Sequence, residues 1–324
     1  MGPVVRAAER HQVVLYLGAL GCAVVVGLLA PEPTGPALEH TIEPVLGLLL
    51  YATFLQVPFL DAAAGLRDVR FLGAVLGLNF VVAPSVVWGL VQLLPPGRAV
   101  LVGVLLVLLT PCVDYVIVFT GLAGGAADRL VAAAPVLMLL QLVLLPVYLY
   151  AFVGADLAAV VDPGPFLRAL VVLLVVPLAL AAATQALVGR SAVARGVETV
   201  MAAAMVPLMV ATLFVVVASQ VAEVGGRLGD VAAAVPVLVA WFVVMTAAGT
   251  VLARVVGLDV PRSRALVFTG ATRNSLVVLP LALALPDAYA LAAVVVVTQT
   301  LVELVAMVVL VRVVPLLLPA RVPV

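Results

Sequence analysis

The sequence predicts an all-α, polytopic membrane protein, and two observations carry that prediction. Of the 324 residues, 66% are hydrophobic and only 10% are charged, whereas soluble domains are nearer half apolar and a quarter charged. The apolar residues also form unbroken runs of the length that a spanning helix needs. They lack the alternating pattern of membrane β-strands. Helices are therefore expected to cross the membrane, and no segment reads as a soluble domain.

Ten candidate spans follow from the apolar runs between charged or Pro/Gly-rich breaks. They are expected near 13–30, 44–60, 71–94, 99–122, 130–153, 165–188, 199–222, 231–254, 265–285 and 289–318. The segment between the first two spans, "PEPTGPALEHTIEP", is expected to be an outer loop. The last run is longer than a bilayer requires, so we expect it to tilt or to project into water.

The arginines predict the orientation of the chain. All 16 basic residues are Arg, and there is no Lys. Twelve of them fall on one side of the ten-span arrangement and three on the other, which leaves Arg273 within a span. Because positive residues stay inside, both termini are expected in the cytoplasm. The Ala, Val, Leu, Arg, Gly and Pro bias is typical of a GC-rich genome and points to a bacterial inner membrane. No basic run suggests nucleic-acid binding.

An internal repeat is predicted within one transporter domain of residues 1–324. Two sets of five spans, about 13–153 and 165–318, would enter the membrane from opposite sides, as in an inverted-topology repeat. The fourth span of each set is interrupted by polar residues, in "VLLVLLTPCVDYVIVFTGLAGG" and "ALVFTGATRNSLVVLPLALALP". Interrupted helices in matching positions of two halves point to a binding site. We therefore expect discontinuous fourth and ninth helices that cross.

The first interruption places Thr110, Pro111, Cys112 and Asp114 at membrane depth. Pro111 lacks a backbone donor and frees carbonyls that need partners. These carbonyls, the hydroxyl, the thiol and the carboxylate can line one polar cavity. The alternative for Pro111 and Cys112 is a helix kink with a structural thiol. Asp114 favours a function, because a carboxylate in mid-membrane costs at least about 2.5–3.5 kcal/mol.

The second interruption, "TGATRNS", supplies Thr269, Gly270, Arg273 and Asn274. Gly270 permits backbone geometries that other residues avoid, and the hydroxyl and amide groups can coordinate ions or polar solutes. If the two broken helices cross, Arg273 can pair with Asp114. The alternative is that this pair only locks the crossing, because buried charges need partners whether or not they take part in transport.

The last span carries a further polar face. Gln299 and Glu303 are four residues apart and share one side of a helix, which is expected to look into the bundle. A protonatable acid there is a candidate proton carrier. Other polar residues within spans, among them Gln56, Asn79, Gln141 and Gln185, are interpreted as interhelical hydrogen-bond partners.

No catalytic arrangement is predicted, so the chain is not expected to be an enzyme or to hold a cofactor. Both histidines, His11 and His40, lie outside the spans, and no His reaches the depth of Cys112. Cys22 reads as a small buried residue of the first span.

The chain resembles the bile acid/sodium symporter superfamily, whose members have ten spans, two five-helix inverted repeats and crossing broken helices. Within it, "TPCVDYVIVFTGLAGG" is similar to the Pro-Cys motif of the arsenite efflux permeases. "FTGATRNSLVVLPLALALP" is similar to their Phe-Thr-x-Ala-x-x-Asn segment, and "LVELVAM" to their last-helix Val-Glu. The matching residues of these two segments are Phe268, Thr269, Ala271, Asn274, Val302 and Glu303.

The resemblance implies a secondary transporter that exports arsenite or antimonite by proton antiport. Cys112 would bind the trivalent metalloid, which is thiophilic and suits a soft ligand. The other substrate-site residues are expected to be Thr110, Pro111, Thr269 and Asn274. The residues expected to couple proton or ion movement are Asp114, Glu303, Arg273 and Gln299.

The chain also departs from the arsenite-permease pattern. Asp114 and Arg273 are additions to it, and the Gly-Gly and Ser-Asn sodium ligands of the bile-acid symporters are missing from the fourth helix. Proton coupling is therefore favoured over sodium, although Asp114 and Asn274 can contribute oxygens. The alternative is a sodium- or proton-coupled carrier of a bile-acid-type organic anion, with Arg273 meeting its carboxylate or sulfonate.

Overall fold

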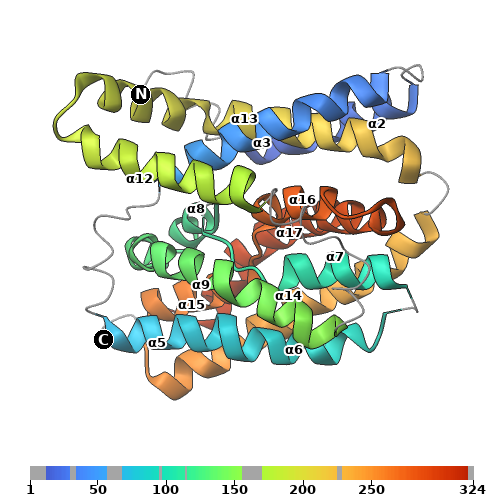
Figure 1. Cartoon of the computed structure of the whole chain (residues 1–324). Coiled ribbons are helices and arrows are strands. Elements are labelled where there is room, and N and C mark those ends of the chain that lie inside the picture. The colour runs from blue at the N-terminus through green and yellow to red at the C-terminus, as the bar shows by residue number, and fades with distance from the viewer. Residues whose placement is uncertain are drawn as a thin grey trace. The chain divides into compact units, whose positions relative to one another are not determined.

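The computed structural model describes residues 12–29, 34–56, 68–94, 97–113, 115–154, 170–224 and 228–319, and most of them lie in helices (Figure 1). Five of the described helical segments are long and apolar enough to cross a membrane: Val69–Val91, Ala127–Val153, Ala192–Ser219, Val231–Val256 and Leu291–Leu317. The predicted class, an all-helical membrane protein, is confirmed. Each of the ten expected ranges contains helix, while the count of ten spans and the inverted repeat stay predictions.

The chain divides into two compact units, and the first combines Met1–Gln56 with Gly164–Leu228. Its elements are α2 (Gln12–Leu29), α3 (Thr34–Gln56), the π-helix η3 (Leu170–Val175), α12 (Val176–Val188) and α13 (Ala192–Val224). Helix α13 packs against α2 and α3, and α12 packs against α3. Gln185 Nε2 donates to the carbonyl oxygens of Leu55 at 3.0 Å and Phe54 at 3.3 Å. This confirms the interhelical hydrogen-bonding role predicted for Gln185.

Helix α3 begins ten residues earlier than the second expected span, inside the segment interpreted as an outer loop. The expectation of a loop over residues 34–44 was wrong. Pro36 lies in the first turn of α3, where its missing N–H costs no helical hydrogen bond. The polar residues that follow therefore extend the helix beyond its apolar part.

The second unit combines Val57–Pro163 with Gly229–Val324 and contains every predicted site residue. Its elements are α5 (Val69–Gly77), the π-helix η2 (Leu78–Val82), α6 (Ala83–Val91), α7 (Arg98–Leu108), α8 (Tyr115–Leu122), α9 (Ala127–Val153), α14 (Leu228–Val256), α15 (Val260–Ala271), α16 (Ser275–Leu283), the 3-10 helix η4 (Asp287–Tyr289) and α17 (Leu291–Leu317). Helix α17 packs against α7 and α16, and α15 packs against α5, α8 and α9. A Cβ atom on Gly103 would lie 2.8 Å from Ala292 Cα, so only glycine lets α7 approach α17 this closely.

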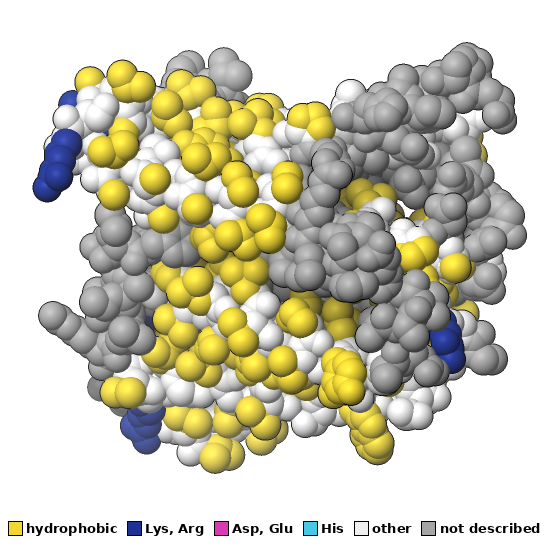
Figure 2. Space-filling view, in the orientation of Figure 1, with side chains coloured by type: hydrophobic (Ala, Val, Ile, Leu, Met, Phe, Trp, Pro, Cys, Tyr) yellow, Lys and Arg dark blue, Asp and Glu magenta, His cyan; other side chains and the backbone are white. Residues whose placement is uncertain are grey.

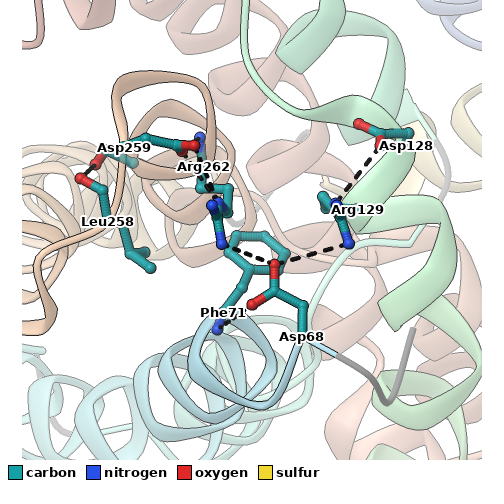
Figure 3. Close-up of polar contacts among 8 residues, drawn as sticks. Asp68, Phe71, Asp128, Arg129, Leu258, Asp259 and Arg262 are labelled. Carbon is teal, nitrogen blue, oxygen red and sulfur yellow. Dashed lines mark hydrogen bonds and ion pairs between the residues drawn. The ribbon is translucent and has the colours of Figure 1, made fainter. Parts of the chain in front are cut away.

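Ion pairs gather where α5, α9 and α15 begin (Figure 3). Asp68 caps α5 by accepting a hydrogen bond from Phe71 N at 3.2 Å. Its other carboxylate oxygen lies 3.0 Å from Arg262 Nη1 and 3.8 Å from Arg129 Nη1. Asp259 caps α15 and accepts from Arg262 Nε at 3.1 Å, and this hydrogen bond is the main cause that raises the pKa of Arg262. The Asp68 carboxylate therefore interacts with the first turns of α5, α9 and α15.

The described surface is rich in exposed apolar side chains. On the face shown in Figure 2, hydrophobic side chains predominate and Arg side chains lie at the margins. Val69, Val255 and Leu316 each expose at least three quarters of their surface, at 75%, 77% and 79%. Contiguous apolar surface of this kind marks a membrane interface, as the composition predicts.

Candidate functional site

The structure brings the two predicted interruptions together. Helix α7 ends at Leu108 and α8 begins at Tyr115, while α15 ends at Ala271 and α16 begins at Ser275. Between these ends, Pro111 and Arg273 form an isolated antiparallel β-bridge. Asn274 N donates to Thr110 O at 2.8 Å. Two breaks whose bridged residues are 162 positions apart in the chain thus form one pairing, which we call the helix crossing.

The Arg273 guanidinium lies at this crossing with none of its surface exposed. Its Nη2 donates to Asn79 Oδ1 at 2.9 Å, to Thr269 O at 3.3 Å and to Gly270 O. Its Nη1 donates to Leu108 O at 3.4 Å. Three of these four acceptors are carbonyls in the last turns of α7 and α15, where helix carbonyls lack intrahelical partners and carry partial negative charge.

Trp241 of α14 forms one wall of the crossing. Its ring lies under the Arg273 guanidinium, with 4.8 Å from the guanidinium carbon to the ring centroid, a cation–π contact. Its Nε1 donates to Ala271 O, the last carbonyl of α15, at 2.9 Å. The side chain is fully buried, so this contact is shielded from water.

Glu303 and Gln299 of α17 face the same crossing. Arg273 N donates to Glu303 Oε2 at 3.0 Å, and Gln299 Nε2 donates to the same carboxylate oxygen. Gln299 Oε1 in turn accepts from Ser275 Oγ at the start of α16. Both side chains of α17 are fully buried. The predicted shared face of Gln299 and Glu303, turned into the bundle, is confirmed.

Asp114 lies outside the described residues, so its pairing with Arg273 stays a prediction. Among the described residues, Arg273 and Glu303 are the only charged side chains in the buried set. The described partners of the guanidinium are neutral oxygens, a type of acceptor that the prediction did not include.

The substrate residues predicted on the first break differ in what they offer. Cys112 is fully buried and directly follows Pro111, whose backbone pairs with that of Arg273. Thr110 Oγ1 donates to Leu106 O, one turn back, at 2.8 Å. The Thr110 hydroxyl proton is therefore used within the helix end, whereas the Cys112 thiol lies buried at the break.

The two substrate residues predicted on the second break are Thr269, which precedes Arg273 in the chain, and Asn274, which follows it. Thr269 accepts a hydrogen bond from Asn79 Nδ2 at 3.4 Å through its hydroxyl. Asn274 caps α16, because its Oδ1 accepts from Val277 N at 3.2 Å. Asn274 Nδ2 is buried and has no hydrogen-bond partner among the described residues. This amide group can therefore donate a hydrogen bond to a polar solute bound at the crossing.

Asn79 and Trp241 are the site residues that the sequence reasoning missed. Asn79 was interpreted only as an interhelical hydrogen-bond partner. It does donate to Thr269 of α15, but its Oδ1 also accepts a hydrogen bond from the buried Arg273 guanidinium. The sequence feature that could have indicated a site role is a single amide side chain in the apolar run "LGLNFVV", because a polar side chain within a membrane span costs free energy. Trp241 gave no signal, since an aromatic residue in a span is ordinary.

The helix crossing thus combines a fixed cation, a thiol, a protonatable carboxylate and an unused amide donor in a place shielded from water. Such groups inside a membrane bundle mark substrate and ion pathways. Half-helix ends at a crossing of broken helices form the binding sites of secondary transporters.

Comparison with known proteins agrees with this arrangement. The chain matches the model of the Sodium Bile acid symporter family over residues 43–227, more than half of its length, which includes Asn79, Cys112 and the first break. No curated protein matches the chain significantly. The chain is therefore an integral membrane protein that belongs to the sodium bile acid symporter family, a family of transporters.

Proposed function

We propose that this transporter exports trivalent arsenic or antimony in exchange for protons, from a bacterial cytoplasm and with both termini inside. We further propose ten spans in two inverted repeats. The division into units supports the repeats, because each unit takes one segment from each half of the chain: 1–56 with 164–228, and 57–163 with 229–324. Each half would then give two helices to the first unit and three to the second.

The observation that carries the substrate proposal is the position of the buried Cys112 at the helix crossing, next to Pro111, whose backbone pairs with that of Arg273. Cys112 is taken to react as a thiol, a nearby cation favours the loss of its proton, and soft trivalent metalloids bind the sulfur. Arsenous acid would exchange one hydroxyl group for the Cys112 sulfur. The hydroxyl leaves as water with the thiol proton, and the reverse reaction releases the substrate. A single sulfur keeps this capture reversible.

Glu303 is proposed to carry the exchanged proton. It accepts hydrogen bonds from Arg273 N and Gln299 Nε2 when ionised. A proton added to the carboxylate would compete with these donors and loosen the contact between α17 and the second break. Proton binding and the geometry of the crossing are coupled in this way.

The test compares the two cysteines of the chain. In a bacterial strain without arsenite pumps, Cys112→Ser should remove resistance to arsenite while the protein stays at wild-type levels in the membrane. Cys22→Ser is the matched control and should retain resistance. Cys22 is exposed on α2, so the expectation that it is buried was wrong. Resistance that survives in the Cys112→Ser strain would exclude the thiol mechanism.

A groove between α14 and α17 favours a second candidate, an amphipathic organic anion. It has a volume of about 880 Å³ and apolar walls, with Arg254 among its lining residues, and small-molecule sites are typically 300–1,000 Å³. Thr246 also lines it and has a buried hydroxyl without a partner among the described residues. Arg254, exposed on α14, is better placed than buried Arg273 to meet a carboxylate or sulfonate.

Uptake of labelled taurocholate into proteoliposomes decides between the candidates. The organic-anion function predicts uptake that Arg254→Gln weakens and Cys112→Ser leaves unchanged. Arsenite transport without taurocholate transport, in the same vesicles, would reject it.

A further inference from the structure

The oxygen atoms around Arg273 form a cage of the kind that holds a monovalent cation. Four acceptors from three segments converge on the guanidinium: Asn79 Oδ1 of η2, Leu108 O of α7, and two carbonyls of α15. Unwound carbonyls and half-helix C-terminal ends are the groups that coordinate coupling ions in transporters with broken helices. The ring of Trp241 adds a cation-binding face.

The cage is built for positive charge independently of the arginine. Carbonyls in the last turns of α7 and α15 accept hydrogen bonds from this one guanidinium, at ends where both helix macrodipoles are negative. The Glu303 carboxylate accepts a hydrogen bond from Arg273 N at 3.0 Å and so adds a negative group to the same crossing. Carbonyl oxygens collected in a water-free interior are costly without a cation or donors to satisfy them.

We propose that Arg273 is a tethered cation, whose guanidinium permanently fills a monovalent-cation site at the helix crossing, so that the chain binds no sodium there. The guanidinium is covalently attached and fully buried, so no ion in solution can compete with it under ordinary conditions. The Arg273 side chain supplies the positive charge that a cation bound from solution would otherwise supply.

Removal of the side chain should uncover the site. Arg273→Ala leaves Asn79 Oδ1 and the three carbonyls without the guanidinium and opens a space that a small cation can enter. Sodium or free guanidinium should then bind and stabilise the protein, because a ligand that binds only the folded state raises its stability with concentration. A side chain that merely locked the crossing would leave a variant that no added cation rescues.

The experiment measures thermal unfolding of the purified full-length protein in detergent, at constant ionic strength, with choline, sodium or guanidinium chloride in the millimolar range. The wild-type midpoint should be the same in choline and sodium. Arg273→Ala should unfold at a lower temperature and regain about 5 °C at saturating sodium or guanidinium. Arg312→Ala, at an exposed arginine of α17, is the matched control and should not respond.

Tryptophan fluorescence gives a second readout at the site. The two Trp residues are Trp241, in contact with Arg273, and Trp88, which is 65% exposed. In a Trp88→Phe background, cation binding to Arg273→Ala should shift the Trp241 emission saturably. If neither sodium nor guanidinium changes the Trp241 emission or the unfolding midpoint of Arg273→Ala relative to choline, the proposal is overturned.

The wild type decides the question even if Arg273→Ala does not fold. Saturable stabilisation of the wild type by millimolar sodium that Asn79→Ala abolishes would show an open cation site and refute a tethered cation. The assay contains no substrate, so its outcome is independent of the proposed arsenite export.

Discussion

Asn79→Ala tests whether the buried guanidinium depends on its cage. The substitution removes the acceptor that lies 2.9 Å from Arg273 Nη2, and it also deletes the donors to Val75 O and Thr269 Oγ1. A hydrogen bond to a charged group contributes about 1.5–3 kcal/mol, and a buried charged donor that loses its partner is costlier than a neutral one. The free energy of unfolding should fall by at least that amount. For a unit of this size, the midpoint should fall by about 4–10 °C.

The assay is thermal unfolding in detergent, with two comparison variants. Asn79→Asp keeps an acceptor oxygen opposite the guanidinium and should lose less stability than Asn79→Ala. Gln92→Ala removes a side-chain amide from a residue beyond the end of α6 and should change the midpoint little. A midpoint for Asn79→Ala within 1 °C of the wild type would mean that the guanidinium does not need this acceptor, and the reasoning about the cage would fail.

Three further substitutions test the packing, the charged end and the proton carrier. Gly103→Ala puts a methyl group 2.8 Å from the backbone of α17 and should cost about 1–3 kcal/mol in unfolding experiments, whereas Gly89→Ala, with nothing within 4 Å, should not destabilise. Asp68→Asn keeps a helix cap but removes the charge that faces two arginines, and the free energy of unfolding should fall by about 0.5–1 kcal/mol. The control Asp128→Asn changes a side chain that is 79% exposed and should leave the stability unchanged. Equal losses in the two variants would contradict the role of the Asp68 ion pairs. Glu303→Gln should leave the protein folded and abolish the dependence of efflux on a pH gradient, and efflux that still follows the gradient would assign the proton to another group.

Much of the fold and half of the site could be predicted from local sequence. Long apolar runs predicted the helices, and the polar letters in "TPCVD" and "TGATRNS" predicted both breaks, because polar groups in hydrocarbon need a reason and a partner. Four-residue spacing was enough to place Gln299 and Glu303 on one face. These features depend on residues that are near one another in the chain.

The partners of Arg273 could not be predicted in the same way. The cage depends on the crossing of α7 and α15, on the π-helical turn at Asn79 and on the approach of Trp241 from α14, and each brings together residues far apart in sequence. The pairing expected for Arg273 used charge alone, whereas helix-end carbonyls carry partial charge that no side-chain letter records. A buried arginine next to two predicted helix breaks should therefore be tested against carbonyl partners first.

The separation between Arg273 and its partners also bears on how the protein is made. An arginine at the centre of an inserting helix costs about 2.5–3.5 kcal/mol at the translocon, and α15 contains Arg262 and Arg264 as well. Its acceptors on Asn79 and Leu108 precede Arg273 by 194 and 165 residues, so they are synthesised and in the bilayer first. We therefore expect residues 260–283 to insert by docking onto earlier helices, and we expect this segment to stay in water in a nascent chain that lacks α5, η2 and α7.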